Sequence, residues 1–331
     1  LSVYCEVKHS ITCGNGTDAL LLSLMALEIK ENDIILCPSF SFVATAEMVP
    51  LLGGKLMFVD VEYESFNIDI ISLKRCIQYL KKLNLKPKGI ITVDLFGHPA
   101  NLKEIEALAQ DEQIWMICDA AQSFGSSINK KKIGSFGDIT TTSFFPSKPL
   151  GAYGDGGAIF TNKDWLAEKI ISLRVHGKSK SKYINKNIGI NSRLDSIQAG
   201  ILVKKLSIFN KEIILRNEIA EIYSNELKSF FKVPRIKSGH QVVWAQYTLN
   251  LDNKKNRSEI LQKLDDENIP TMIYYPVPIH EQSPYKNSLK DPNGLNVSKK
   301  LSQNVFSIPI YPYLEREKQE FIIDKLKKYS A

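Results

Sequence analysis

The sequence predicts an α/β protein: a large α/β/α domain with a mainly parallel sheet, followed by a smaller C-terminal α+β domain. Two observations carry this prediction. Up to about residue 162, short β-rich runs alternate with helical patterns, as strands and helices do around a parallel sheet. Later, a long helical stretch leads to a few separate strands and a final helix. We therefore place the large domain at residues 1–215 and the small domain at residues 216–331.

The strands of the large domain are expected in runs that are almost continuously apolar, which is typical of strands buried on both faces. Helices should lie between these runs, for example over residues 102–111. Asp94, Asp119 and Ser143 stand near strand ends, and open α/β sheets bind ligands at the carboxyl ends of their strands. The runs are DIILCPS, KLMFVDV, GIITVDLFG, IWMICDAAQS, DITTTSFF and GGAIFTN.

The pattern changes after residue 162. A helix is expected over residues 164–173, followed by the Lys-rich loop HGKSKSKYINKN and a long helix that begins near SRLDSIQAG. Strands are expected in VVWAQYTLNL, IPTMIYY and FSIPIY, and a last helix in EREKQEFIIDKLKKYS.

Composition excludes several classes of protein. The longest apolar run, residues 19–27, is about half as long as a membrane-spanning helix, so we expect no membrane span. The net charge of +7 is spread over Lys-rich segments, which does not favour nucleic-acid binding. No histidines stand at H-x-H or H-x-x-x-H spacing, so we expect no metal site.

The cysteines indicate the cellular compartment of the protein, and the first residues indicate whether a segment precedes them. Five cysteines form an odd set without a C-x-x-C pair, which indicates a reduced, cytoplasmic protein. The sequence begins at Leu1 and runs almost at once into a strand and a glycine turn. We therefore expect that an N-terminal segment is missing.

The stretch CGNGTDALLLSLMAL contains a G-x-G-x-x-A pattern at Gly14, Gly16 and Ala19. A dinucleotide-binding fold would place an acidic residue at the end of the next strand, but Asp33 precedes that strand. We therefore interpret the turn as a general phosphate site, formed by the backbone N–H groups and the Thr17 hydroxyl at the start of a helix. The alternative is a helix start capped for stability by Thr17 and Asp18.

The stretch DITTTSFFPSKPLGAYGDGGAIFTN places Lys148 in a turn between two apolar segments. A partly desolvated lysine there can lose its proton and attack a carbonyl group to form a Schiff base. Upstream, Asp119 ends a buried strand, where a carboxylate could keep a pyridinium nitrogen protonated, as pyridoxal phosphate requires.

Taken together, the motifs resemble the pyridoxal-phosphate-dependent nucleotide-sugar aminotransferases of the DegT/DnrJ/EryC1/StrS family. The resemblance runs from about residue 5 to the C-terminus and implies the fold type I of PLP-dependent aminotransferases. It also implies that the glycine turn binds the cofactor phosphate. The matching motifs are NGTDAL, PSFSFVATAE, FVDVEYESFNID, VDLFGHPANL, DAAQSFGS, GSFGDITTTSFFPSKPLGAYGDGGAIFTN, NSRLDSIQAGIL and YYPVPIH.

The resemblance assigns a role to each matching residue. Lys148 corresponds to the lysine that forms the Schiff base and moves the proton, and Asp119 to the partner of the pyridine nitrogen. Asn191 corresponds to an asparagine that reaches the phosphate of the neighbouring subunit, which implies a homodimer with shared active sites. The other expected cofactor ligands are Gly16, Thr17 and Ser143 at the phosphate, Phe42 stacked on the ring, and Gln122 near the ring hydroxyl.

The resemblance implies transfer of an amino group from L-glutamate to a nucleotide-linked keto-sugar. Several segments are most similar to enzymes that aminate C3 of UDP-2-acetamido-2-deoxy-3-oxo-glucuronate, so a role in O-antigen or other lipopolysaccharide synthesis is expected. Arg193 could pair with a sugar carboxylate. Tyr274 and His280 of the segment IYYPVPIH complete the expected substrate site, and Tyr274 stands where relatives often carry histidine.

Three alternatives remain. One is a C3 or C4 aminotransferase acting on a dTDP- or UDP-linked keto-deoxysugar. Another is a sugar dehydratase on the same fold, which Lys148 disfavours because such relatives carry histidine there. The third is a non-catalytic regulator or binding protein, which the presence of Lys148, Asp119 and Ser143 disfavours.

Overall fold

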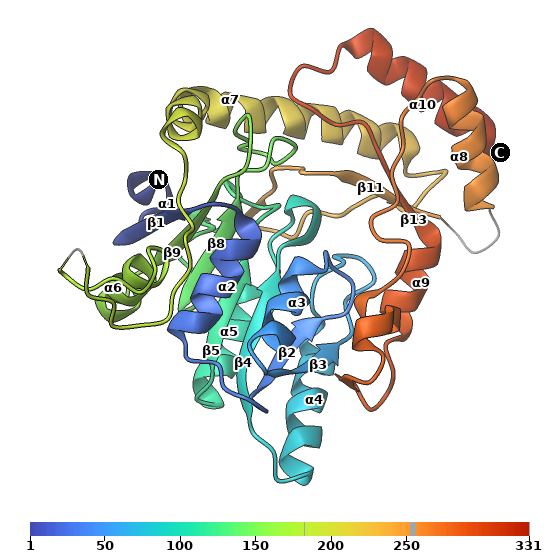
Figure 1. The fold of residues 1–331 in the computed structure, drawn as a ribbon. Coiled ribbons are helices and arrows are strands. Elements are labelled where there is room, and N and C mark those ends of the chain that lie inside the picture. The colour runs from blue at the N-terminus through green and yellow to red at the C-terminus, as the bar shows by residue number, and fades with distance from the viewer. Residues whose placement is uncertain (182, 252–255, 331) are drawn as a thin grey trace.

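The computed structural model describes residues 1–181, 183–251 and 256–330. At its centre lies an eight-stranded sheet in the order β1-β9-β8-β5-β4-β2-β3-β12 (Figure 1). Strand β9 runs antiparallel to both neighbours, whereas all pairs from β8 to β12 are parallel. The expected mainly parallel sheet is therefore confirmed. Its strands are β1 (His9–Cys13), β2 (Ile34–Pro38), β3 (Lys55–Val59), β4 (Pro87–Val93), β5 (Trp115–Asp119), β8 (Ile139–Ser143), β9 (Gly157–Thr161) and β12 (Leu289–Lys290).

Both faces of this sheet are apolar because successive side chains of a strand point to opposite faces. In β2, Ile35 and Cys37 join the core on one face, and Ile34 and Leu36 join the core on the other. This double burial explains the continuous apolar runs of the sequence. Helices α2 (Gly16–Ala26), α3 (Ala44–Leu51) and α6 (Asp164–Leu173) cover the first face, and α4 (Ile70–Lys82) and α5 (Leu102–Asp111) the second.

The long helix α7 (Ser196–Leu227) connects this sheet with a second core and crosses the top of the molecule in Figure 1. Its first half packs Leu202 and Phe209 against the flank of the sheet. Its second half packs Tyr223 and Leu227 into the second core. The rest of that core comes from β11 (Tyr247–Asn250), α8 (Arg257–Asp266), β13 (Val305–Ile308) and α10 (Arg316–Ser330).

The C-terminal part also returns to the large sheet. Strand β12 pairs with β3, and Ile279, Tyr285 and Leu295 are buried in the core of the large sheet. The division at residue 215 stays a prediction, and the segment around residues 279–295 packs with the large domain. The remaining α-helices and strands are α1 (Ser2–Cys5), α9 (Asn296–Asn304) and the three-stranded sheet of β6 (Ser127–Ile128), β7 (Lys131–Lys132) and β10 (His240–Gln241).

Two expected strands differ from the structure. The segment IPTMIYY forms no strand and makes one isolated bridge, between Met272 and Ser307. Its flanking prolines lack N–H donors, which disfavours a longer ladder. The run VVWAQYTLNL forms a strand only from Tyr247, because Trp244 takes a left-handed φ of 52°.

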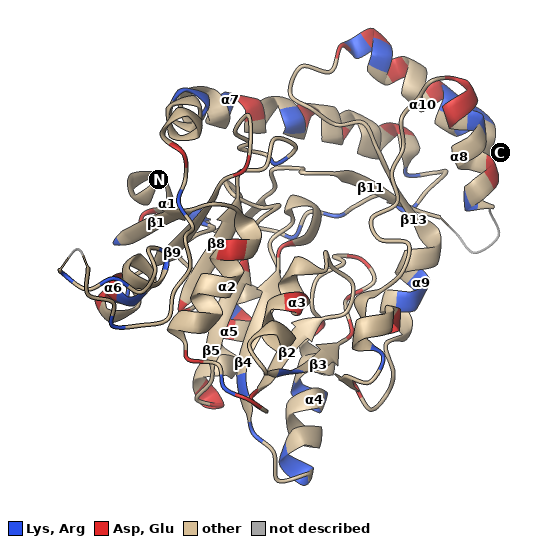
Figure 2. Ribbon diagram, in the orientation of Figure 1, with Lys and Arg blue, Asp and Glu red and all other residues tan. Residues whose placement is uncertain are grey.

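Charged residues are sparse on the central strands and frequent on outer helices such as α8 and α10 (Figure 2). Among the described residues, no helix combines the length and apolarity that crossing a membrane requires. All five cysteines are buried and free.

Candidate active site

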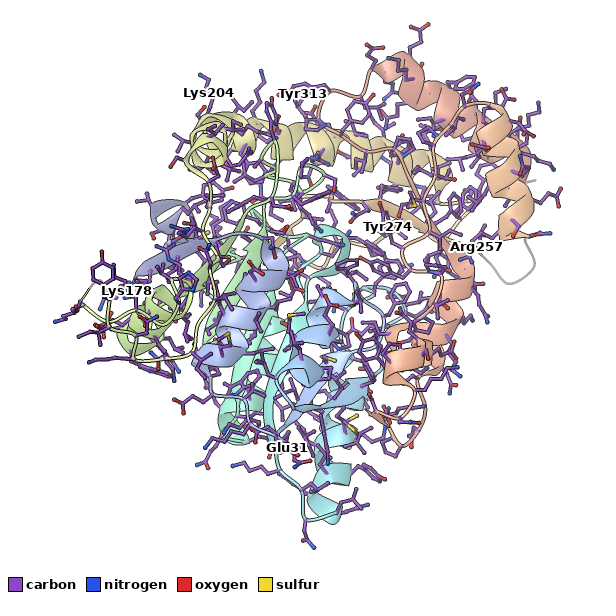
Figure 3. The ribbon with its side chains drawn as sticks, in the orientation of Figure 1. Glu31, Lys178, Lys204, Arg257, Tyr274 and Tyr313 are labelled. Carbon is purple, nitrogen blue, oxygen red and sulfur yellow. The ribbon has the colours of Figure 1, made fainter. Side chains whose placement is uncertain are left out.

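A cavity of about 550 Å³ opens at the carboxyl ends of β5 and β8. Segments distant in the sequence close it, including residues 274 and 275 of the C-terminal part. In Figure 3, Tyr274 lies in the interior between the sheet and the C-terminal helices, whereas Lys178 and Lys204 lie at the surface. The predicted site residues that line this cavity are Gly16, Thr17, Phe42, Asp119, Gln122, Ser143, Lys148 and Tyr274.

Lys148 lies in a tight turn that follows β8. Its backbone N–H donates to the carbonyl of Phe145 at 2.8 Å. A Cβ on Gly151 would come within 2.4 Å of the Pro146 carbonyl oxygen, so the turn requires glycine there. Burial lowers the pKa of Lys148, and the nearby charge of Asp119 partly opposes this shift. The amine is thus closer to its neutral, nucleophilic form than the amine of an exposed lysine.

Asp119 is the last residue of β5 and is 7% exposed. Its Oδ2 accepts a hydrogen bond from the Thr45 hydroxyl at 2.9 Å, and its Oδ1 accepts from the Ala121 N–H at 3.1 Å. Burial raises the pKa of Asp119 above its ordinary value, and these two hydrogen bonds and the charge of Lys148 offset this rise only in part. The hydrogen bonds therefore favour the ionised carboxylate that a protonated pyridine nitrogen needs as its partner.

The Thr45 hydroxyl is itself held by a second hydroxyl, since Ser41 Oγ lies 3.1 Å from Thr45 Oγ1. Sequence reasoning missed both residues. The available signal was the spacing of two hydroxyls one helical turn apart, beside Phe42 in the run SFSFVATAE.

The start of α2 lies against Ser143. A Cβ on Gly16 would come within 2.7 Å of the Ser143 Cβ, so a side chain at residue 16 would push the helix away. The first N–H groups of a helix have no partner within it and, with the helix dipole, favour an anion. The arrangement of Gly16, Thr17 and Ser143 therefore fits a phosphate group.

Thr17 and Asp18, which the alternative interpretation named as the caps of this helix, do not cap it. Asn15 is the N-cap, because its side chain accepts a hydrogen bond from the Asp18 N–H at 2.7 Å. Helix α2 already begins at Gly16, so Thr17 and Asp18 belong to its first turn. The Asp18 carboxylate instead accepts a hydrogen bond from Ser192 Oγ at 2.6 Å.

Two aromatic rings frame the cavity. Phe42 is 52% exposed although it is aromatic, and its ring centroid lies 6.2 Å from that of Tyr275. The Tyr275 hydroxyl accepts a hydrogen bond from Gln122 Nε2 at 3.3 Å, while Gln122 Oε1 accepts from the Phe96 N–H at 2.6 Å. The exposed ring of Phe42 offers an apolar face on which a flat heteroaromatic ring can stack. Sequence reasoning did not identify Tyr275 as a site residue.

Gln246 is another cavity residue that the sequence did not reveal. It lies just before β11, and its side-chain Oε1 is buried with no partner among the described residues. A buried acceptor without a donor is costly, so this oxygen is suited to receive a hydrogen bond from a bound molecule. No motif in the sequence marks this position.

Three predicted site residues lie outside the lining of this cavity. Asn191 and Arg193 are exposed, and Arg193 Nε donates to Asn191 Oδ1 at 3.0 Å. His280 is 4% exposed, is hydrogen-bonded to Ser39 Oγ, and packs beside the ring of Phe58. These contacts let His280 hold the C-terminal segment against the end of β2.

The groups that meet in the cavity fit pyridoxal phosphate. The helix start can bind a phosphate, the ring of Phe42 can stack on a pyridine, and Asp119 can pair with its nitrogen. Lys148 then presents an amine to the aldehyde. Such a site can exchange an amino group between two carbonyl compounds.

Comparisons with known proteins agree with this geometry. Residues 1–327 match the DegT/DnrJ/EryC1/StrS aminotransferase family. The chain is 40% identical over 316 residues to the UDP-2-acetamido-2-deoxy-3-oxo-D-glucuronate aminotransferase of Pseudomonas aeruginosa, covering 95% of this chain and 84% of that protein. It is 38% identical over 315 residues to a UDP-N-acetyl-3-dehydro-alpha-D-glucosamine 3-aminotransferase of Acidithiobacillus ferrooxidans, covering 94% and 81%. A crystal structure of a DegT DnrJ EryC1 StrS aminotransferase from Brucella abortus matches with a TM-score of 0.97 at 43% identity, covering 100% and 88% of the two chains.

Proposed function

Because the chain belongs to the DegT/DnrJ/EryC1/StrS aminotransferase family, we propose that it uses pyridoxal phosphate to transfer an amino group from L-glutamate to a nucleotide-linked keto-sugar. One observation carries the proposal: Lys148, Asp119 and the start of α2 line a single cavity. These are the amine, the carboxylate and the phosphate site that the cofactor needs. Their presence together disfavours a non-catalytic binding protein and, at Lys148, a dehydratase.

Each residue has a defined task in this reaction. Bound pyridoxal phosphate supplies a reactive carbonyl and an electron sink. The N–H groups at the start of α2 and the Ser143 hydroxyl hold the phosphate, and the Asp119 carboxylate holds a proton at the ring nitrogen. Lys148 Nζ accepts a proton from the α-carbon of the amino donor and donates one toward the sugar carbon that receives the amine. Phe42 and Tyr275 limit the access of water.

For the acceptor we propose C3 of UDP-2-acetamido-2-deoxy-3-oxo-glucuronate. Both relatives described above act, by their names, on UDP-linked sugars with an N-acetyl group and an oxidised C3, which supports this position. Arg193, with its exposed guanidinium, is proposed to pair with the C6 carboxylate, and Tyr274 to contact the sugar. The alternative is a C3 or C4 aminotransferase of a dTDP- or UDP-linked keto-deoxysugar.

We propose a homodimer in which Asn191 and Arg193 of one subunit complete the active site of the other. Both side chains are exposed and lie outside their own cavity. Large apolar side chains are exposed nearby: Ile188 is 92% exposed, Ile197 73% and Val203 73%. Exposed apolar patches of this kind are typical of interaction surfaces.

The five buried, free thiols support a cytoplasmic location. Nucleotide-linked amino sugars are precursors of surface polysaccharide, so we propose a role in that synthesis, such as that of the O-antigen.

The first test is the half-reaction with L-glutamate. The protein loaded with pyridoxal phosphate should release about one 2-oxoglutarate per subunit without an acceptor, because the amine stays on the enzyme. Lys148→Ala should release none, since no other described cavity residue supplies a comparable amine. Lys163→Ala, which removes a surface lysine paired with Asp138, should behave like the parent.

The same experiment can contradict the proposal. Release of 2-oxoglutarate that does not depend on Lys148 would remove the central role of this residue. Adding UDP-linked 3-oxo-uronate, UDP-linked 3-oxo-glucosamine and dTDP-linked 4-keto-sugar in separate reactions then identifies the acceptor by mass spectrometry. Amination of the 4-keto-sugar alone would favour the alternative substrate.

A further inference from the structure

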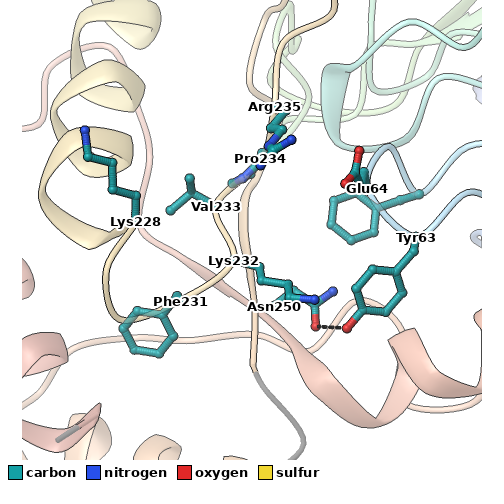
Figure 4. A pocket seen from close by; sticks show the side chains of 10 residues that line it. Tyr63, Glu64, Lys228, Phe231, Lys232, Val233, Pro234, Arg235 and Asn250 are labelled. Carbon is teal, nitrogen blue, oxygen red and sulfur yellow. Dashed lines mark hydrogen bonds between the residues drawn. The ribbon is translucent and has the colours of Figure 1, made fainter.

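A second cavity, of about 450 Å³, lies where the loop after β3 meets the segment between α7 and β11 (Figure 4). It shares no lining residue with the active-site cavity. Tyr63, Glu64 and Phe66 form one wall, and Asn250 lies at the end of β11. Residues 228 and 231–235 form the other wall. The cavity is therefore built from both the large and the small part of the chain.

Asn250 gives this cavity a buried donor without an acceptor. The residue is 2% exposed, and its Oδ1 accepts a hydrogen bond from the Tyr63 hydroxyl at 3.2 Å (Figure 4). Its Nδ2 is buried and has no partner within the described part of the chain. A buried amide group of this kind is costly unless something accepts its hydrogen bond.

The charges around the cavity have a positive excess. Lys228, Lys232 and Arg235 line it together with a single carboxylate, that of Glu64. The ammonium groups of Lys232 and Lys300 lie 4.9 and 5.0 Å from the centroid of the Tyr63 ring. Neighbouring ion pairs use other side chains, such as Lys237 with Glu62 at 2.9 Å.

We propose that this second cavity binds a small anion that carries phosphate groups. Lysine, arginine and the free Asn250 amide are all donors, so the matching ligand presents acceptor oxygens and negative charge. Arginine and lysine together are typical of phosphate recognition. The volume also lies in the range of small-molecule sites.

The position of the cavity connects it with the active site. Phe66 lines the cavity and packs edge-on against Phe96, with ring centroids 5.2 Å apart. Phe66 and Phe96 belong to a core cluster against which Tyr274 and Tyr275 also pack, and these tyrosines line the active-site cavity. A ligand here would thus join the two parts of the chain beside the tyrosine wall of the active site.

The test is calorimetric titration of the full chain, loaded with pyridoxal phosphate, with inorganic pyrophosphate. Loading fills the phosphate site at α2, and the binding that the Lys232→Ala/Arg235→Ala variant loses, rather than any binding that remains at the proposed substrate site, reports the second cavity. Lys232→Ala/Arg235→Ala should weaken binding about tenfold or more, because two charge-assisted contacts are lost. Glu64→Gln should tighten binding about threefold by removing the one repulsive carboxylate. The matched control Lys82→Ala/Lys86→Ala removes two exposed lysines near the end of α4 and should leave the affinity unchanged.

Equal affinity for pyrophosphate in the parent and all three variants would overturn the proposal. The absence of pyrophosphate binding at 0.15 M salt would also overturn it, because attraction to surface charges is largely screened at this concentration. Citrate serves as a comparison with the same acceptor oxygens on carboxylates. Tighter binding of citrate than of pyrophosphate would overturn the assignment to phosphate. This binding assay does not use turnover, so its outcome is independent of the proposed aminotransferase reaction.

Discussion

The Asp119 carboxylate is fixed on both of its oxygens before any cofactor arrives. Thr45 holds Oδ2 and the Ala121 N–H holds Oδ1, while Ser41 lies within hydrogen-bond distance of the Thr45 hydroxyl. Such positioning matters because a carboxylate that turns away from a ring nitrogen cannot keep that nitrogen protonated. At the scale of single residues, we therefore expect catalysis to depend on Thr45, which holds Asp119 although it does not line the cavity itself.

Thr45→Val should lower kcat about tenfold and leave the KM for L-glutamate nearly unchanged, because one hydrogen bond to a charged group is worth about 1.5–3 kcal/mol. The variant should also bind pyridoxal phosphate more weakly. Its visible absorbance should titrate at a different pH from that of the parent, which a merely structural role would not cause. Thr45→Ser keeps the hydroxyl and should restore all three properties. A valine variant with parental absorbance titration and kcat would contradict this role.

Residues that carry chemistry in recognisable motifs could be predicted from the sequence, and those that position them could not. Lys148 and Asp119 stand in runs whose strand ends and turns are readable, and both line the cavity. Thr45, Tyr275 and Gln246 become site residues only because folding brings distant segments together. Hydroxyl, phenol and amide side chains are common in any sequence, so their types alone give no signal.

At the scale of elements, the start of α2 depends on one close contact. Gly16→Ala should weaken binding of pyridoxal phosphate at least about tenfold and lower the free energy of unfolding by about 1–3 kcal/mol, because the added methyl overlaps Ser143. Equilibrium titration with the cofactor and thermal melting measure the two effects.

A second glycine provides the control for this change. A Cβ on Gly200, within α7, meets nothing within 4 Å. Because Gly200 lies between Ile197 and Val203 of the proposed dimer surface, the control is valid for Gly200→Ala protein that keeps the parental oligomeric state; it should then keep cofactor affinity and gain up to about 1 kcal/mol of stability, since alanine is the better helix former. Equal cofactor affinity in the two alanine variants would show that the contact between Gly16 and Ser143 does not shape the phosphate site.

Elements of the large sheet were predictable because burial on both faces leaves an apolar run in the sequence. Elements of the C-terminal part were harder to predict from the sequence. The segment IPTMIYY is rich in β-branched and aromatic residues, yet Tyr274 and Tyr275 line the cavity rather than a ladder. The two-residue strand β12 has no sequence pattern, and its place beside β3 follows only from the tertiary fold.

At the scale of the whole molecule, the proposed shared active site makes activity depend on residues of both subunits of the dimer. Lys148→Ala and Arg193→Ala should each be impaired alone. Unfolding and refolding an equal mixture should restore about a quarter of the parental activity, because half of the dimers are mixed and each of these has one intact site. The measurement is turnover against mixing ratio. Failure of any mixture to recover activity would place Arg193 in its own subunit's site or outside catalysis.

The length of helix α7 connects two distant parts of the molecule. Its 32 residues span about 48 Å. Near its start, Lys205 Nζ donates to the Gly151 carbonyl at 2.6 Å in the turn that carries Lys148, and near its end the Tyr223 hydroxyl donates to the Pro309 carbonyl at 3.0 Å. A tilt of about 5° around its middle would move each end by roughly 2 Å and Lys205, about 10 Å from the middle, by roughly 1 Å, so a movement at the C-terminal end of the helix is coupled to the lysine turn. We therefore expect Tyr223→Phe, which removes the contact with the Pro309 carbonyl, to change the position of the Lys148 turn although it lies outside the active-site cavity.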